Sequence, residues 1–243
     1  KNSVGIDLTE EKNIEFFTNL QKIENVKSNS VVNGTDKVTD IKEIIVSPYN
    51  NSKIIGETSY ADENIIKEAI EYLTSYSKEW KNTHLDKRVD IVNKFANLLE
   101  SNYHTLVSCC VKEAGKTIQD SIADIREAVD FCRYYAEEAK IIFKEKHLPG
   151  PTGEKNIYQL KGRGLTCVIS PWNFPVAIFV GQIVSCLLAG NTVIAKPAEQ
   201  TSIIAYETCK LLFKAGLPKN ALQLLLGKGE EIGPKILLNN KIK

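Results

Sequence analysis

The sequence of 243 residues contains no methionine, and Lys1 occupies the first position. Ordinary composition would supply roughly five methionines in a chain of this length. The absence predicts a piece of a longer polypeptide. Neither sign of charge dominates, because the sequence contains 31 Lys and Arg residues and 30 Asp and Glu residues, for a formal net charge of +1. A balanced charge argues against a nucleic-acid partner, which requires a basic surface.

Histidine and paired cysteines are also scarce. The three His and six Cys form no CxxC spacing and no Cys/His cluster, so no metal site is expected. Most of the cysteines lie among apolar neighbours and are interpreted as buried free thiols, which predicts a reducing, cytoplasmic location. A redox pair is the alternative for the adjacent Cys109 and Cys110, although neighbouring cysteines on a helix are more often packing residues.

No targeting segment stands out. Residues 1–10 lack the hydrophobic stretch of a secretory signal. Residues 165–195 carry no formal charge over 31 positions, which is long enough for a membrane-spanning helix. However, Pro171, Pro175 and Gly190 interrupt this run, and a spanning helix must satisfy its backbone continuously. We therefore expect a buried core here and no transmembrane segment.

The first two thirds of the chain show a helical pattern after a polar start. Residues 1–45 have few regularly spaced apolar positions and are interpreted as an arm or linker. Two short strands are predicted around a turn that contains Pro48. Helices are predicted at residues 62–80, 85–102, 103–115 and 117–143, followed by a strand at 156–160.

From residue 164 onward, short buried runs alternate with helices. The segments at 165–169, 192–195 and 223–226 are interpreted as buried strands, and their alternation with helices predicts parallel strands joined by β-α-β crossovers. A doubly wound sheet normally has five or six strands. We therefore expect an α/β chain that stops partway through its sheet.

Two glycine patterns invite comparison with phosphate-binding loops. Gly115-Lys116-Thr117 resembles the end of a P-loop, but Cys110 stands where that motif requires glycine, so we interpret Gly115 as a helix stop. Gly227, Gly229 and Gly233 follow a strand and open a helix, with one residue more than the dinucleotide fingerprint. Nucleotide contact and a simple tight turn both remain open for this second loop.

Polar residues follow two of the buried strands. The first strand runs into a turn in which Pro171 and Pro175 fix the backbone around Asn173. Such an asparagine can donate to a developing oxyanion, or it can bond its own backbone. The second strand delivers Lys196 and Glu199, either as a solvated salt bridge or as a pair that binds ribose hydroxyls. Because both strands end in polar groups at one edge of the sheet, a ligand site is favoured.

The order and spacing of these motifs resemble the aldehyde dehydrogenase superfamily. The matching segments are ISPWNFP at 169–175, AGNTV at 189–193, KPAE at 196–199, GLP at 216–218 and the glycines of 227–229. Further segments are most similar to the pyrroline-5-carboxylate dehydrogenase part of the bifunctional proline utilisation A family: NSVGIDL at 2–8, EAGKT at 113–117, REAVD at 126–130 and AIFVGQ at 177–182.

This resemblance implies a truncated NAD-binding domain with an N-terminal helical layer and a parallel β-α-β sheet. The regions that it implies are an arm or linker at 1–45, the helical part of the domain at 46–146, a strand excursion toward an oligomerisation flap at 147–162 and the first half of the Rossmann-like fold at 163–243. The parent protein is implied to be a homo-oligomer, with FAD as well as NAD if a proline dehydrogenase part is present.

The implied activity is the NAD-dependent oxidation of L-glutamate γ-semialdehyde, a small aldehyde, to glutamate in proline catabolism. In this chemistry a thiolate attacks the aldehyde, hydride leaves to the nicotinamide, and a carboxylate activates water. The family's nucleophilic cysteine and general-base glutamate lie downstream of the last matching motif. We therefore expect no activity from this chain alone. A stand-alone non-catalytic fragment and an aldehyde dehydrogenase of other specificity are the alternatives.

The resemblance also assigns roles to individual residues. Asn173 is implied as the oxyanion donor, and Phe174 as a residue that faces the aldehyde. The implied cofactor-binding residues are Ile169, Ser170, Pro171, Trp172, Lys196, Glu199, Gly229 and Glu230. Within this set, Lys196 and Glu199 would hold the hydroxyls of the adenosine ribose.

Overall fold

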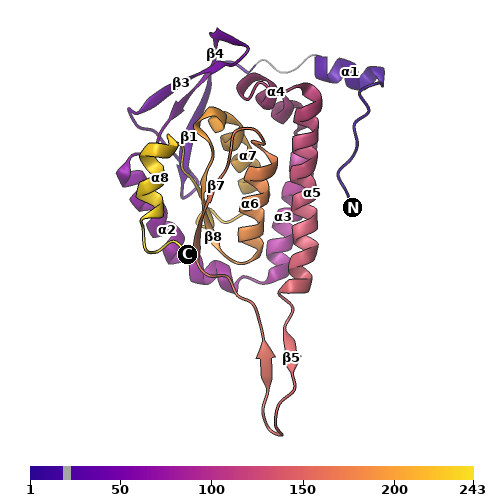
Figure 1. Cartoon of the computed structure of the whole chain (residues 1–243), viewed down its shortest axis with the longest axis vertical. Coiled ribbons are helices and arrows are strands. Elements are labelled where there is room, and N and C mark those ends of the chain that lie inside the picture. Colours follow the sequence, from indigo (N-terminus) through magenta and orange to yellow (C-terminus); the bar gives the residue numbers. More distant parts are fainter. Residues whose placement is uncertain (19–22) are drawn as a thin grey trace.

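A computed structural model describes residues 1–18 and 23–243. Its centre is a seven-stranded mixed sheet in which six strands follow the order β3-β4-β1-β9-β8-β7 and β2 pairs with β1 (Figure 1). The strands of this sheet are β1 (Val26–Val32), β2 (Thr35–Lys37), β3 (Lys42–Ser47), β4 (Asn50–Ser59), β7 (Leu165–Ile169), β8 (Thr192–Lys196) and β9 (Leu222–Leu224).

Helices cover both faces of the sheet. They are α1 (Glu11–Thr18), α2 (Glu63–Asn82), α3 (Leu85–Ser101), α4 (Tyr103–Glu113), α5 (Ile118–Ile142), α6 (Ala177–Leu188), α7 (Ser202–Lys214) and α8 (Gly229–Leu237), with the short 3-10 helix η1 (Glu199–Thr201). Helices α2 and α8 share one apolar cluster with Leu165, Ile194 and Leu225. Helices α3 to α7 fill a larger cluster on the opposite face, where α5 packs outside α3 and α6.

The predicted β-α-β crossovers are confirmed. Strand β7 pairs in parallel with β8, and β8 pairs in parallel with β9. Helix α6 connects the first pair and α7 connects the second. All five residues of β8 are buried, which explains why Val193, Ile194 and Ala195 in its middle are consecutive apolar residues rather than an alternating pattern.

The sheet is larger than the sequence pattern indicated, because the expected arm contributes to it. Strand β1 lies between β4 and β9, parallel to β4 and antiparallel to β9. Its buried side chains include Ser28, which shares a hydrogen bond of 2.7 Å with Thr58, and Ser30, which accepts from the Leu226 amide. A strand whose buried positions are partly serine has no hydrophobic periodicity to reveal it. Positions 19–22 of the expected arm lie outside the described residues.

The strand excursion forms a separate two-stranded hairpin. Strands β5 (Lys146–Leu148) and β6 (Asn156–Tyr158) pair antiparallel and project away from the body of the molecule (Figure 1). Leu148, Ile157 and Tyr158 are exposed on this hairpin. Its role in oligomerisation stays a prediction.

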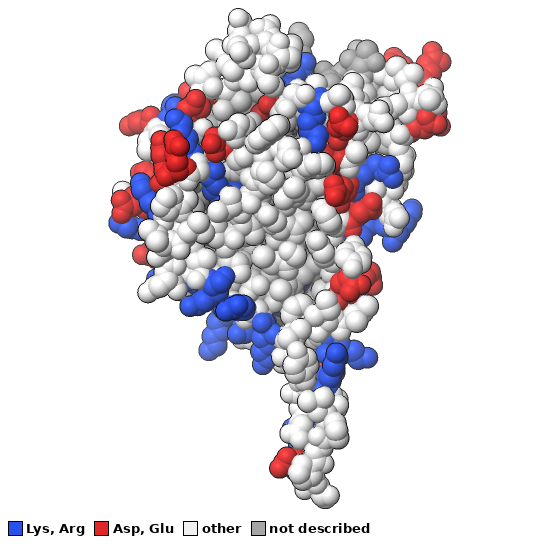
Figure 2. All heavy atoms as spheres, viewed as in Figure 1, with Lys and Arg blue, Asp and Glu red and all other residues white. Residues whose placement is uncertain are grey.

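Figure 2 shows charged side chains around the rim of the viewed face, while the centre, over β7 and α6 in Figure 1, is largely uncharged. Strand β7 is at the edge of the sheet, where Leu165 also makes a parallel bridge with Ile242. Within the two described ranges, no helix combines the length and the apolar character needed to cross a membrane.

Candidate functional site

Two turns lie next to each other at the carboxyl ends of β7 and β8. The register of these strands sets Ile169 opposite Lys196. The amide of Ser170 then donates to the Lys196 carbonyl oxygen at 3.1 Å. Segments 169–175 and 196–199 are therefore neighbours at one edge of the sheet, as the sequence analysis expected.

Lys196 and Glu199 form an ion pair at this edge. The Nζ atom of Lys196 lies 3.1 Å from Oε2 of Glu199. The Lys196 side chain is 4% exposed, whereas the Glu199 side chain is 33% exposed. Burial acts to raise the pKa of Glu199, but hydrogen bonds from its own backbone, from Lys196 and from the Gly229 backbone hold this pKa below its usual range. The pair thus offers an ionised acceptor and an ionised donor side by side, which suits a vicinal diol.

The glycine loop 227–229 approaches this pair from β9. A Cβ atom added to Gly229 would lie 3.5 Å from the Lys196 Nζ atom. A Cβ atom at Gly227 would lie 2.9 Å from Cγ2 of Ile232, so the loop requires glycine there to pack on α8. An added Cβ atom at Gly233 would meet nothing within 4 Å. Glu230 is exposed in the first turn of α8.

The turn after β7 exposes Asn173 together with its neighbours Trp172 and Phe174. The turn is anchored at its start by Ser170, which is buried and whose Oγ atom donates to Oε1 of Gln182 in α6 at 2.9 Å. Pro171 is exposed between this anchor and Trp172. The segment therefore presents one amide and two aromatic side chains from a fixed base.

Sequence reasoning missed two residues that hold this turn. The ammonium of Lys116 donates to the carbonyl oxygen of Asn173 at 2.9 Å and lies 4.5 Å from the centre of the Phe174 ring. It also lies 3.4 Å from Oδ2 of Asp124, whose Oδ1 atom accepts from the Ala177 amide at 2.8 Å. Burial raises the pKa of Asp124, and the bonds from Ala177 and Lys116 oppose that rise. No local pattern links residues 57 and 53 positions apart in the sequence.

Five of the six cysteines lie in surroundings that disfavour a thiolate. Cys109, Cys110, Cys132 and Cys209 are buried, and burial raises the pKa of each thiol above its ordinary value. For Cys167, burial raises the pKa to about 11. In the part of the chain that the structure describes, no three His, Cys, Asp or Glu side chains are arranged to hold a metal ion.

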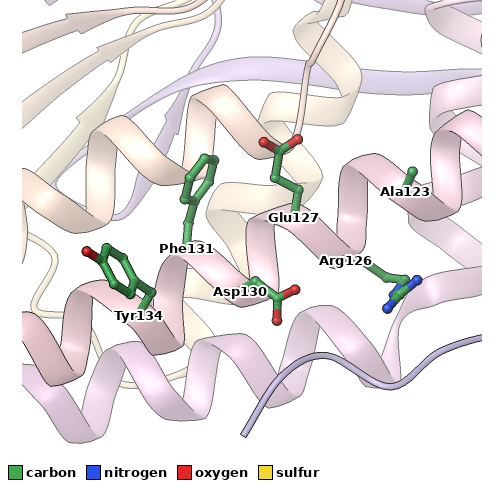
Figure 3. A pocket seen from close by; sticks show the side chains of 6 residues that line it. All are labelled: Ala123, Arg126, Glu127, Asp130, Phe131 and Tyr134. Carbon is green, nitrogen blue, oxygen red and sulfur yellow. The ribbon is translucent and has the colours of Figure 1, made fainter.

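A separate groove of about 440 Å³ lies on α5, lined by Ala123, Arg126, Glu127, Asp130, Phe131 and Tyr134 (Figure 3). In Figure 3, Glu127 and Phe131 point to one side of the helix and Asp130 to the other. Asp130 accepts from the Ser3 amide and hydroxyl at 2.6 and 3.0 Å, and the Arg126 Nε atom donates to the Ser3 hydroxyl at 3.3 Å. These charged groups fasten the N-terminal segment to α5.

Comparisons with known proteins agree with this geometry. The sequence profile of the Aldehyde dehydrogenase family matches residues 37–243. The chain is 38% identical over 201 residues to the bifunctional protein PutA of Salmonella typhimurium. The aligned region covers 82% of this chain and 14% of that protein. It is 34% identical over 236 residues to the 1-pyrroline-5-carboxylate dehydrogenase of Staphylococcus saprophyticus. This alignment covers 96% of this chain and 46% of that protein.

Solved structures give the same result. Proline utilization A from Bdellovibrio bacteriovorus superimposes with a TM-score of 0.96 at 32% identity, covering 100% of this chain and 26% of that one. The 1-pyrroline-5-carboxylate dehydrogenase from Thermus with bound NAD gives a TM-score of 0.94 at 29% identity, covering 100% of this chain and 48% of that one. The chain thus spans about half or less of the length of these relatives. Its sequence and its fold place it in the aldehyde dehydrogenase family.

Proposed function

We propose that this chain is the front part of an NAD-dependent L-glutamate γ-semialdehyde dehydrogenase, which oxidises the aldehyde to glutamate in proline catabolism. The observation that carries the proposal is that the Asn173 turn and the Lys196–Glu199 pair follow adjacent parallel strands at the carboxyl edge of the sheet. The substrate class rests on the relatives, which are named for pyrroline-5-carboxylate and for proline utilisation.

The residues at this edge suit an adenosine ribose. In the proposal the Glu199 carboxylate accepts hydrogen bonds from the ribose hydroxyls, and the Lys196 ammonium donates to them. The Gly229 backbone, which lies beside Lys196, leaves room for the adenine, with Glu230 next to it. Residues 169–172 line the rest of the cleft. The cofactor, when bound, supplies the acceptor for hydride.

The residues of the β7 turn suit the reacting aldehyde. In the proposal the side-chain amide of Asn173 donates to the oxygen on which negative charge develops, and the exposed Phe174 ring faces the aldehyde. A fixed, neutral donor stabilises charge that forms only in the transition state, and it does not need to reorganise. The anchoring of the turn by Ser170 and Lys116 is what such a donor requires.

We further propose that this chain alone is inactive and binds NAD weakly. Burial raises the pKa of Cys109, Cys110 and Cys132, so these thiols are poor nucleophiles at neutral pH. The uncharged face over β7 and the parallel bridge from Ile242 support a sheet that continues beyond β7. A longer polypeptide would then add the reactive cysteine, the base and the turn that holds the pyrophosphate.

The location and assembly of the parent protein are also proposals. Six cysteines without a disulfide fit a reducing, cytoplasmic compartment. The projecting hairpin exposes Leu148, Ile157 and Tyr158, which fits a contact with a second copy in a homo-oligomer.

The test measures NADH formation from glutamate semialdehyde by the 243-residue chain and by the full-length polypeptide encoded with it. We expect turnover from the full-length polypeptide and none from the chain alone. Turnover approaching about 1 per second from the chain alone, the low end of ordinary enzymes, contradicts the inactivity. A full-length polypeptide that oxidises other aldehydes but not glutamate semialdehyde contradicts the proposed substrate.

A further inference from the structure

The corner between α4 and α5 contacts the turn after β7 and the start of α7, the helix that follows the Glu199 turn. Helix α4 ends at Glu113 and α5 begins at Ile118, so four residues connect them. Gly115 adopts a φ of +68°, a conformation that favours glycine, and the Lys116 amide closes the corner on the Cys110 carbonyl oxygen at 3.2 Å. The corner therefore fixes the backbone positions of Glu113 and Lys116 relative to each other. The Lys116 side chain extends to the turn after β7, and the Glu113 side chain extends to the start of α7.

Lys116 holds the second half of the turn after β7, directly at Asn173 and through Asp124 at Ala177. Its ammonium bonds the carbonyl oxygen of Asn173, and it pairs with Asp124, whose other oxygen bonds the amide of Ala177. The Lys116 side chain is 12% exposed and the Asp124 side chain is fully buried. Removing the ammonium would leave a buried carboxylate without its cation, which is a costly state. Asn173 would then lose its bond to the corner, and the stretch up to Ala177 would keep only the hydrogen bond from the Ala177 amide to an Asp124 carboxylate that has lost its cation.

Glu113 holds the start of α7 in the same manner. Its Oε1 and Oε2 atoms accept from the amides of Ile203 and Ile204 at 2.7 and 2.8 Å. The first amides of a helix have no partner within the helix, so this buried carboxyl caps α7 from another element. Helix α7 follows η1, which begins with Glu199. The hydroxyl of Ser202, the first residue of α7, donates to the Glu199 carbonyl oxygen at 3.0 Å, which links the capped end of α7 to the Glu199 turn.

We propose that the α4–α5 corner positions the cofactor cleft, with Lys116 setting the Asn173 turn and Glu113 setting the Glu199 turn. Both are positioning residues, since they act through Asn173 and Glu199. What the two turns bind rests on the proposed function; the positioning itself does not. The two variants should separate, because Lys116 acts on the turn assigned to chemistry and Glu113 acts on the turn assigned to the cofactor.

Amide hydrogen exchange on the 243-residue chain tests the positioning without any activity. In Lys116→Met we expect exchange at Ala177 and its neighbours in the turn to rise at least about tenfold, with α2 and α3 unchanged. In Glu113→Gln we expect the same rise at one of Ile203 and Ile204, because the side-chain carbonyl oxygen can still accept from one amide while the new NH2 group faces the other. Lys112→Met is the matched control, since Lys112 lies on α4 and contacts the Tyr49 ring instead.

Conservative variants keep the test decisive. Lys116→Arg retains a cation near Asp124 and should restore most of the protection at Ala177. If Lys116→Met does not fold, Lys116→Gln replaces it. Faster amide exchange at Ala177 in Lys116→Gln but not in Lys116→Arg supports the proposal. Unchanged protection at Ala177 in Lys116→Met or Lys116→Gln, or equal loosening of α2 and α3, overturns it.

Kinetics of the full-length polypeptide add a second readout. We expect Lys116→Met to lower kcat about tenfold or more with KM for NAD within about threefold, and Glu113→Gln to raise KM for NAD with a smaller change in kcat. Identical effects of the two variants would contradict the separate positioning of the two turns. If the wild-type polypeptide does not oxidise glutamate semialdehyde, the proposed function fails while the exchange measurement still decides the role of the corner.

Discussion

The Lys196–Glu199 pair allows a prediction whose magnitude follows from burial. Glu199→Gln keeps the size of the side chain and an oxygen that can accept from Lys196, but it removes the negative charge. The Lys196 ammonium, 4% exposed, would then remain at the edge of the sheet without its carboxylate. We expect the variant to lower the free energy of unfolding and to weaken NAD binding in the full-length polypeptide.

The magnitude lies between two limits. Breaking a fully buried ion pair costs about 3–5 kcal/mol, and an exposed pair contributes about 0–1 kcal/mol. Because the Glu199 side chain is one third exposed, solvent screens the pair, and a loss of about 1–2 kcal/mol is expected. In a protein of this size each kcal/mol lowers Tm by about 2–4 °C. The expected fall in Tm is therefore about 2–8 °C.

Thermal denaturation of the 243-residue chain checks this value. Glu207→Gln is the matched control, because Glu207 and Lys210 on α7 form a pair with the same sequence spacing and N–O distances of 3.0 and 3.1 Å, but Lys210 is 54% exposed. The control should lower Tm by less than about 2 °C. Equal shifts in the two variants would refute the reasoning that the burial of Lys196 makes its partner important.

Three further predictions concern the loop, the central strand and acid. Gly227→Ala should destabilise the chain by about 1–3 kcal/mol because the new Cβ atom crowds Ile232. Gly233→Ala, where the new Cβ atom meets no other atom within 4 Å, should instead stabilise the chain by up to about 1 kcal/mol. Urea denaturation that gives both variants a stability change of the same sign contradicts this. A chain that begins at residue 38 lacks β1 between β4 and β9 and should lose its cooperative thermal transition; a transition at the original Tm contradicts the place of β1 in the fold. The pKa of Glu199 is lowered in the folded chain, so its carboxylate stabilises the fold above its unfolded pKa, and this contribution is lost as pH falls through the folded value. The Tm difference between wild type and Glu199→Gln should therefore shrink between about pH 5 and pH 3, and a difference that persists unchanged contradicts this sign.

The features that sequence reasoning predicted well depend on local signals. The Asp62 carboxylate accepts from the Ile65 amide at 2.8 Å and begins α2, and the Thr117 hydroxyl accepts from the Asp120 amide at 3.0 Å and begins α5. Both caps stand immediately before an apolar helical pattern, so they can be recognised from a few residues. The order of β7, β8 and β9 follows equally from buried runs separated by helices.

The features that it missed depend on contacts between distant segments. The buried serines of β1 are satisfied by Thr58 and Leu226, 30 and 196 positions away, so the strand carries little local signal. Lys116 was compared with a P-loop lysine and set aside, although its partners are Asn173 and Asp124. The motif residues were located because a family pattern exists for them, whereas the residues that hold them in place become visible in the folded chain.

The most direct test of the proposed site is the kinetics of Asn173→Ala in the full-length polypeptide, with kcat, NAD affinity and Tm measured on one preparation. Removing one oxyanion donor typically lowers kcat by about 10²–10³, and the KM for NAD should stay within a few-fold because the cofactor contacts persist. An asparagine that only shapes its turn would instead lower Tm and NAD binding together, with activity per folded, NAD-saturated molecule preserved. A loss of kcat in a stable, NAD-binding variant is the predicted result, and near-wild-type kcat in such a variant would contradict the account.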